Sequence, residues 1–338
     1  MALFVAAFFF FLLPKALTIS FTKETHELLS NTSSKSSQVN QSLEAIYNFV
    51  TGVENATTET RVEITTNVGA EETNVDREAA KVLSFYLLKE QVEEAVRKLE
   101  NKQVLGFSNS AADPLKNYRD LRDLAVGAQH SSKEGEESLV KFSQSIKEQG
   151  ASAKAANLTE TLEEAEKDTE TYLSEASKTA NYYVTYTDSY VDLASIITEV
   201  LTATSLGQVT QSLSDAKKIE QNLKTLEGED LPAEIDEFHA DIVTEVSGAI
   251  EFINTYIKLA TSEDSDAVSK AIKAARDWIS KEQSLALSIQ TNQTNFWKKN
   301  PSISTYDQLS EKQGELLKKL DSERAKQQFF LLSMLGVK

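Results

Sequence analysis

Residues 158–204 read LTETLEEAEKDTETYLSEASKTANYYVTYTDSYVDLASIITEVLTAT and contain neither glycine nor proline. Steps of four and three residues, in alternation, separate the apolar or small side chains Leu158, Leu162, Ala165, Thr169, Tyr172, Ala176, Thr179, Tyr183, Tyr186, Tyr190, Leu193, Ile197, Val200 and Thr204. This spacing places them on one stripe of an α-helix and is typical of helices that pack in a left-handed supercoil. At ~1.5 Å per residue the helix would be roughly 70 Å long, so we expect a rod that packs along other helices.

The same spacing recurs in six other segments, which are 82–99, 115–146, 206–223, 235–260, 268–289 and 309–327. Pro114, Pro232 and Pro301 lie near the starts of three such segments, where a helix tolerates proline best. The chain of 338 residues has only 11 glycines and 4 prolines, too few for the many turns of a sandwich or barrel. The sequence predicts an all-α fold, an elongated antiparallel bundle of seven or eight coiled-coil-like long helices.

We divide the chain into three regions. Residues 1–20 are predicted to be a signal peptide, and residues 21–112 an N-terminal helical region. The latter contains the polar stretch 30–42 (SNTSSKSSQVNQS), which we expect to be mobile or only weakly helical. Residues 113–338 are predicted to form the long-helix bundle.

The first twenty residues, MALFVAAFFFFLLPKALTIS, have the layout of a secretory signal. The apolar run of residues 2–13 is shorter than the ~20 residues needed to span a bilayer, and small residues follow it. We expect cleavage after Ser20 and secretion. The alternative is an unusually apolar first helix. We expect no transmembrane segment elsewhere.

Charge and cysteine content exclude several classes of function. The formal net charge is −17, which makes nucleic acid and anionic membrane surfaces poor partners. Without cysteine the chain has no disulfide, thiol nucleophile or cysteine zinc site. The acidic run between Glu160 and Glu170 is interpreted as a solvated helix face.

The three histidines form no recognisable metal motif. His26 is followed by Ser30 where a zinc-protease helix needs a second histidine. The spacing of Asp236 and His239 is that of a di-iron bundle, but no acid stands three residues before His26 or His130. We expect solvated or capping histidines. We predict no catalytic, cofactor-binding or metal site, and no enzyme activity.

Four closely spaced tyrosines, Tyr182, Tyr183, Tyr186 and Tyr190, are the most distinctive local feature. One interpretation is a patch that recognises a partner, because tyrosine offers a large contact area at low entropic cost. The other is a core layer whose hydroxyl groups reach water at the edge of the bundle. The second is favoured because three of the four lie on the predicted stripe.

N-glycosylation motifs occur at five asparagines. In a secreted chain we predict glycans on Asn31, Asn40, Asn55 and Asn157. Asn292 continues the stripe of Leu285 and Ile289, so we expect it to be packed and unmodified.

These features favour a secreted, glycosylated structural or interaction protein that presents a helical surface to a protein partner, either a second copy or another protein. The alternative is an extracellular lipid carrier of the exchangeable apolipoprotein type. Such a carrier needs wide apolar faces, whereas the stripe here is narrow and interrupted by threonines.

Overall fold

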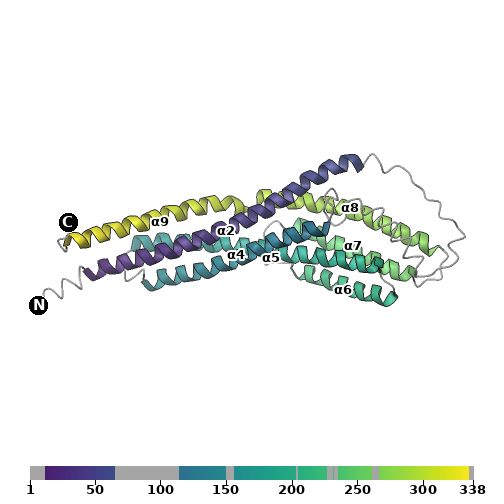
Figure 1. Cartoon of the computed structure of the whole chain (residues 1–338), viewed down its shortest axis with the longest axis horizontal. Helices are drawn as coiled ribbons and strands as arrows, with labels where there is room; N and C mark the ends of the chain where they lie inside the picture. Colours follow the sequence, from purple (N-terminus) through teal and green to yellow (C-terminus); the bar gives the residue numbers. More distant parts are fainter. Residues whose placement is uncertain are drawn as a thin grey trace. The chain divides into compact units, whose positions relative to one another are not determined.

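The computed structural model describes residues 12–64, 114–149, 156–202, 205–226, 231, 235–260 and 266–334 (Figure 1). The elements are α2 (Leu13–Ile64), α4 (Pro114–Gln149), α5 (Ala156–Thr202), α6 (Leu206–Thr225), α7 (Asp236–Ala260), α8 (Ala267–Lys299) and α9 (Pro301–Met334). All are α-helices, which confirms the predicted all-α class. Pro114 and Pro301 begin helices as predicted, whereas Pro232 and the segment 82–99 lie outside the described residues.

The chain divides into two compact units. Unit 1 comprises Met1–Glu44, Ala125–Ala180 and Asn300–Lys338, and unit 2 comprises Ala45–Leu124 and Asn181–Lys299. The units therefore do not coincide with the consecutive regions that we drew in the sequence. Because α2, α4 and α5 are long, each contributes residues to both units.

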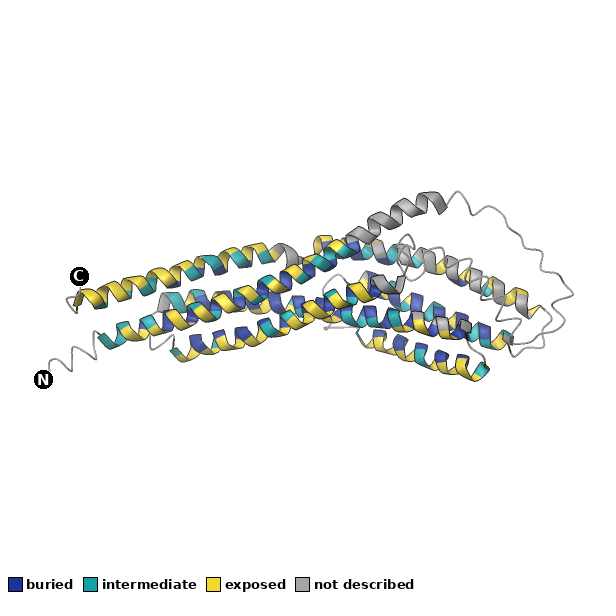
Figure 2. Cartoon of the chain, viewed as in Figure 1, coloured by how far each residue is buried: buried dark blue, intermediate teal, exposed yellow. Residues whose placement is uncertain are grey.

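In unit 1, three pairs of helices are fixed in direction by their side-chain contacts. These contacts join Glu24 to Gln149 and Thr32 to Ser138 (α2–α4), Thr169 to Gln313 and Tyr172 to Tyr306 (α5–α9), and Lys15 to Phe330 and His26 to Asp321 (α2–α9). In each pair the residue number on one helix rises as that on the other falls, so the helices are antiparallel, as predicted. Along these helices the buried residues recur on one side of the ribbon, and exposed residues lie on the other (Figure 2).

The polar stretch 30–42 lies wholly within α2, so the expectation of a mobile or weakly helical segment was wrong. Its buried hydroxyl groups bond to carbonyl oxygens one turn earlier, from Thr32 to Leu28 at 2.9 Å and from Ser36 to Thr32 at 3.0 Å. Thr32 also bonds to Ser138 of α4 at 2.9 Å. These bonds satisfy the polar groups inside the bundle, which lets serine and threonine occupy its interior.

In unit 2, α7 runs antiparallel to α8 and parallel to α5. The contacts pair Phe238 with Phe296, Asp241 with Ser288 and Phe252 with Trp278 (α7–α8), and Tyr182 with His239 and Tyr190 with Glu245 (α5–α7). Ser205 caps α6 by accepting a hydrogen bond from the backbone of Gln208. The contact between α7 and α6 includes a hydrogen bond that Ser247 of α7 donates to Glu220 of α6 at 2.5 Å.

The stripe of α5 is buried as predicted. From Leu162 to Val200 every described side chain of the stripe is buried, and Leu158 at its start is half-buried. The side chains of Ile197 and Thr204 lie outside the described residues. The supercoil that the spacing suggests remains a prediction.

Replacing either of two glycines of α4 with alanine tests the packing of unit 1. A Cβ at Gly127 meets nothing within 4 Å, whereas a Cβ at Gly135 would lie 2.9 Å from Cδ2 of Leu173, which is completely buried. We expect Gly127→Ala to raise the free energy of unfolding by about 0.5–1 kcal/mol, because alanine favours helix. We expect Gly135→Ala to lower it by about 1 kcal/mol, because displacing Leu173 outweighs that gain.

Urea denaturation followed by circular dichroism measures both changes. Equal changes of the same sign would mean that α4 and α5 are not in close contact at Gly135.

Candidate functional site

The interior of unit 2 contains a cluster that we call the aromatic core. It consists of Tyr118 of α4, Tyr182, Tyr183, Tyr186 and Tyr190 of α5, Phe238 and His239 of α7, and Phe296 and Trp297 of α8. Its rings lie in edge-to-face, tilted or stacked pairs, with centroids between 4.8 and 6.3 Å apart. Such pairs stabilise a core beyond the area that they bury.

Helical spacing directs the tyrosines of α5 towards different neighbours. Tyr182 lies against α7, where its hydroxyl group is 3.1 Å from Nδ1 of His239. Tyr183, one residue and ~100° further around the helix, lies against Trp297 of α8. Tyr186 is between them and contacts both of these tyrosines and Tyr190. One face of α5 therefore joins α7 and α8.

A chain of hydrogen bonds links α5 to α8. The indole N–H of Trp297 donates to the hydroxyl oxygen of Tyr183 at 2.6 Å, and that hydroxyl donates to Oε1 of Gln293 at 3.4 Å. Nε2 of Gln293 in turn donates to the hydroxyl oxygen of Tyr186 at 3.0 Å. Both the oxygen and the nitrogen of the Gln293 side-chain amide thus have a hydrogen-bond partner. A shift of one helix along the other would break all three bonds.

A buried carboxyl group joins α5 to α7. Glu245 is buried, and its Oε2 accepts a hydrogen bond from the hydroxyl group of Tyr190. A buried carboxyl is costly without such a partner. Together with the contact between Tyr182 and His239, this bond fixes the two parallel helices in register.

Burial sets the protonation state of the tyrosines. Loss of hydration raises the pKa of the hydroxyl group in Tyr182, Tyr183, Tyr186 and Tyr190 well above its ordinary value of about 10. Negative charge at Glu245 raises it further in Tyr186 and Tyr190. At neutral pH these groups are therefore protonated and act as hydrogen-bond partners in the core.

The interpretation of Tyr182, Tyr183, Tyr186 and Tyr190 as a patch for a partner is wrong for this structure. None of the four side chains is more than 2% exposed. The core interpretation holds, but their hydroxyl groups bond to residues of α7 and α8 rather than to water at the edge of the bundle. The stripe spacing pointed to burial, whereas nothing in the sequence pointed to Gln293, Glu245 or Trp297 as partners.

The prediction of solvated histidines holds for the exposed His130 but not for His239. His239 is buried against Tyr182, while Asp236, three residues earlier, is exposed, so the two do not share a site. His26 and His130 each lie 3.4 Å from a carboxylate, that of Asp321 and of Glu134 respectively. Among the described residues no group of three or more histidine and acidic side chains is placed to hold a metal ion.

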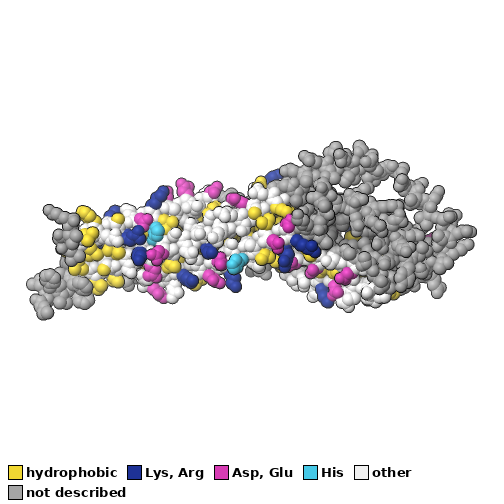
Figure 3. All heavy atoms as spheres, in the orientation of Figure 1, with side chains coloured by type: hydrophobic (Ala, Val, Ile, Leu, Met, Phe, Trp, Pro, Cys, Tyr) yellow, Lys and Arg dark blue, Asp and Glu magenta, His cyan; other side chains and the backbone are white. Residues whose placement is uncertain are grey.

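Charged side chains of both signs spread over the visible face of the described part (Figure 3). In the acidic run of α5, Glu160, Glu163, Glu164 and Glu170 are exposed, as expected for a solvated face. Glu166 and Asp168 are half-buried and pair with Lys147 and Lys312.

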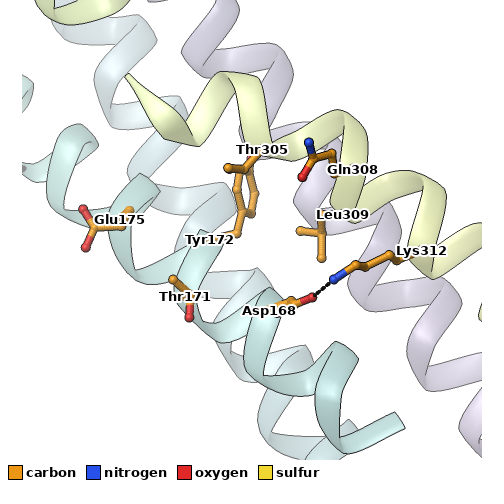
Figure 4. A pocket seen from close by; sticks show the side chains of 8 residues that line it. All are labelled: Asp168, Thr171, Tyr172, Glu175, Thr305, Gln308, Leu309 and Lys312. Atoms are coloured by element: carbon orange, nitrogen blue, oxygen red, sulfur yellow. Dashed lines mark hydrogen bonds and ion pairs between the residues drawn. The ribbon is translucent and has the colours of Figure 1, made fainter. Parts of the chain in front are cut away.

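A shallow groove in unit 1 lies between α5 and α9 (Figure 4). It is lined by Asp168, Thr171, Tyr172, Glu175, Thr305, Gln308, Leu309 and Lys312, and its volume is about 290 Å³. Its cation, Lys312, already donates to Asp168 at 2.6 Å, and this bond raises the pKa of the lysine. The volume of the groove is at the lower limit of the about 300–1,000 Å³ that is typical of ligand sites, which also enclose most of the ligand. The groove is therefore a weak candidate for a binding site.

The predicted glycosylation sites differ in exposure. Asn31 is exposed, although its Nδ2, the atom that would carry a glycan, donates to Oγ of Ser138 at 3.0 Å. Asn40 is buried and donates to Glu44 at 2.7 Å. A glycan on Asn40 would have to displace this side chain from the bundle, so the structure disfavours that prediction. The side chains of Asn55 and Asn157 lie outside the described residues.

Asn292 lies where its place on the stripe predicted. Its side chain is half-buried between α8 and α7 and donates to Asp241 at 3.3 Å and to Ser288 at 3.4 Å. These contacts agree with the expectation that it is packed. Whether it is unmodified stays a prediction.

Comparison of the chain with models of known protein families, with curated proteins and with solved structures finds no match. Function is therefore inferred from the geometry described above.

Proposed function

We propose that this chain is a secreted, glycosylated, non-enzymatic helical interaction protein that presents the outer faces of its helices to a protein partner. The observation that supports this most is the hydrogen-bonded aromatic core. Its histidine, glutamate and tyrosine side chains bond to one another across α5, α7 and α8, so they serve packing. We therefore expect a partner to bind to the outer surface of the helices.

The same core disfavours the alternative of an exchangeable lipid carrier. Helices of such a carrier separate to place their apolar faces on lipid. Separating α5 from α8 would break the bonds among Trp297, Tyr183, Gln293 and Tyr186. Each buried polar group left without a partner costs about 1–3 kcal/mol. We therefore expect this unit to stay closed.

A surface for the partner is available on α4. Val126 and Val140 are both exposed, Val140 by 65%, and they lie two heptads apart on the same side of the helix. A partner helix that packs there would bury both side chains.

The proposal that the chain is secreted depends on its first twenty residues. In the full chain the described part of this segment forms the first turns of α2. Cleavage after Ser20 would leave a helix that begins at Phe21, whose side chain is completely buried, so the remaining bundle keeps its core. None of the described helices has an apolar run long enough to cross a membrane.

Secretion and partner binding can be tested in sequence. We expect the chain expressed in secretory cells to enter the medium with Phe21 as its first residue. Protein captured from the native fluid by this product should fall about tenfold or more when Val126→Glu and Val140→Glu are combined, because two charges would be buried at the contact. Gln41→Glu, on the exposed side of α2 in the same unit, is the control and should leave capture unchanged.

Retention of residues 1–20 on a chain that stays in the cell would contradict secretion. Equal capture by all variants would contradict the α4 surface.

A further inference from the structure

Exposed apolar side chains gather at the end of unit 1 where α2 begins and α9 ends (Figure 3). We call this set the apolar tip, and its members are Leu17, Phe329, Phe330, Leu332 and Met334. Phe329 is 76% and Met334 is 54% exposed. The two helices meet here, because Nζ of Lys15 lies 5.1 Å from the ring centroid of Phe330. Clustered exposure of this kind marks an interaction site.

The tip projects beyond the other helices of unit 1 (Figure 1). α4 ends at Gln149, whose side chain bonds to Glu24 of α2 at 2.7 Å. α5 begins at Ala156, and the antiparallel pairing of Asp168 with Lys312 places that start level with Arg324 of α9. The turns of α2 before Glu24 and of α9 after Arg324 therefore form a two-helix projection of roughly 15 Å.

The end of α9 is apolar over most of its circumference, and the exposed Ser333 is the polar exception among residues 329–334. At ~100° per residue, Phe329, Phe330, Leu332 and Met334 point in four directions that span more than half of the helix circumference. Leu331, half-buried, takes most of the rest. A second helix or a second copy would cover only one side. A helix that is apolar all round belongs in an apolar medium.

Charge changes sign towards the tip. Residues 12–23 and 324–334 include Lys15, Lys23, Arg324 and Lys326 but no acidic residue, in a chain whose net charge is −17. Arg324 and Lys326 pair with carboxylates at positions 321 and 323, which lie about one turn further from the end. These exposed pairs are weak. From the end inward, the order is apolar, basic and then acidic, which complements acyl chains and anionic headgroups.

We infer that the apolar tip docks unit 1 end-on onto an anionic lipid bilayer, with Phe329, Leu332 and Met334 entering the boundary between headgroups and acyl chains. The overall charge of the chain predicts repulsion from such a surface, but the charged side chains next to the tip are basic. This goes beyond the proposed function, because the α4 surface for a protein partner is separate and stays free. The chain would then hold its partner at a membrane.

Cleavage after Ser20 would change the tip. It would remove Leu17 and also Lys15, whose Nζ lies over the ring of Phe330, and would place the new amino group of Phe21 on the same projection. The last two turns of α9 would then carry the whole apolar surface.

Co-sedimentation with vesicles tests the inference on the secreted chain. We expect it to bind vesicles of phosphatidylcholine with phosphatidylserine, and to bind phosphatidylcholine alone at least about tenfold more weakly. Combining Phe329→Ser, Leu332→Ser and Met334→Ser should weaken binding to the mixed vesicles by about tenfold or more. The control combines Val126→Ser and Val140→Ser, which also removes exposed apolar side chains from unit 1, and should bind vesicles like the unchanged protein.

Tryptophan emission distinguishes docking by the tip from the opening of helices that is expected of a lipid carrier. Trp278 and Trp297 are both buried in unit 2, so docking by the tip should leave tryptophan emission unchanged, whereas opening of the helices would shift it to longer wavelength. Binding with such a shift, equal binding by the tip variant, equal binding to both kinds of vesicle, or no binding would each overturn the inference. So would a dimer in light scattering that the tip variant abolishes without any vesicle binding. Protein capture through α4 should survive in the tip variant, so failure here is distinct from failure of the proposed function.

Discussion

Replacing Tyr186 with alanine is expected to lower the free energy of unfolding by about 3–5 kcal/mol, the cost of removing a large buried ring. Tyr186 is 1% exposed and packs against Tyr118, Tyr182, Tyr183 and Tyr190. Its loss would leave a cavity where α4 and α5 meet. Urea denaturation monitored by circular dichroism gives the change directly.

Tyr186→Phe is the matched control. It keeps the ring and removes only the oxygen that accepts a hydrogen bond from Gln293 at 3.0 Å, so we expect a loss of about 1 kcal/mol. If Tyr186→Ala left stability unchanged but abolished capture of a partner, the tyrosines would be a surface patch after all.

Alkaline pH is expected to unfold unit 2 steeply. Burial raises the pKa of Tyr182, Tyr183, Tyr186 and Tyr190 above the value of about 10 that they regain on unfolding. Their contribution to stability is therefore fully present below about pH 10 and is lost as the pH rises from there towards the raised values. Each tyrosine that stays protonated in the folded state costs about 1.4 kcal/mol per pH unit in that window, so the four together cost about 5.5 kcal/mol per pH unit.

Titration of tyrosinate absorbance together with circular dichroism tests this expectation. The four tyrosines should ionise together with the loss of helix. In Tyr186→Phe the dependence on pH should be shallower by about a quarter, because one of the four groups is removed. Ionisation of these four tyrosines near pH 10 with the helices intact would contradict the buried core.

The sequence predicted the helices best where apolar spacing and proline act locally. The stripe of α5 and the helix starts at Pro114 and Pro301 depend on residues close in the chain. The stretch 30–42 was misjudged because serine and threonine disfavour helices in isolation. Their hydroxyl groups become acceptable only when they bond to carbonyls of the preceding turn and to a neighbour such as Ser138.

The aromatic core could be predicted only in part. Tyr183, Tyr186 and Tyr190 share the stripe, which indicated burial. Their partners on α7 and α8 lie more than fifty residues away in the chain, and helical spacing says nothing about which helices become neighbours. Nothing in the sequence therefore indicated that Trp297 and Glu245 are partners of these tyrosines. The apolar tip was equally hidden, because it depends on where α4 and α5 end relative to α2 and α9.

Peptide-resolved nitration of tyrosines in the native protein tests most directly whether the aromatic core is sealed. Nitration requires reagent to reach the ring, and Tyr306 is half-exposed while the four tyrosines from Tyr182 to Tyr190 are not. We predict that Tyr306 is modified at neutral pH while those four stay unmodified until the protein is unfolded. Modification of the four at the rate of Tyr306 in the folded protein would contradict a closed core and return the tyrosines to the surface.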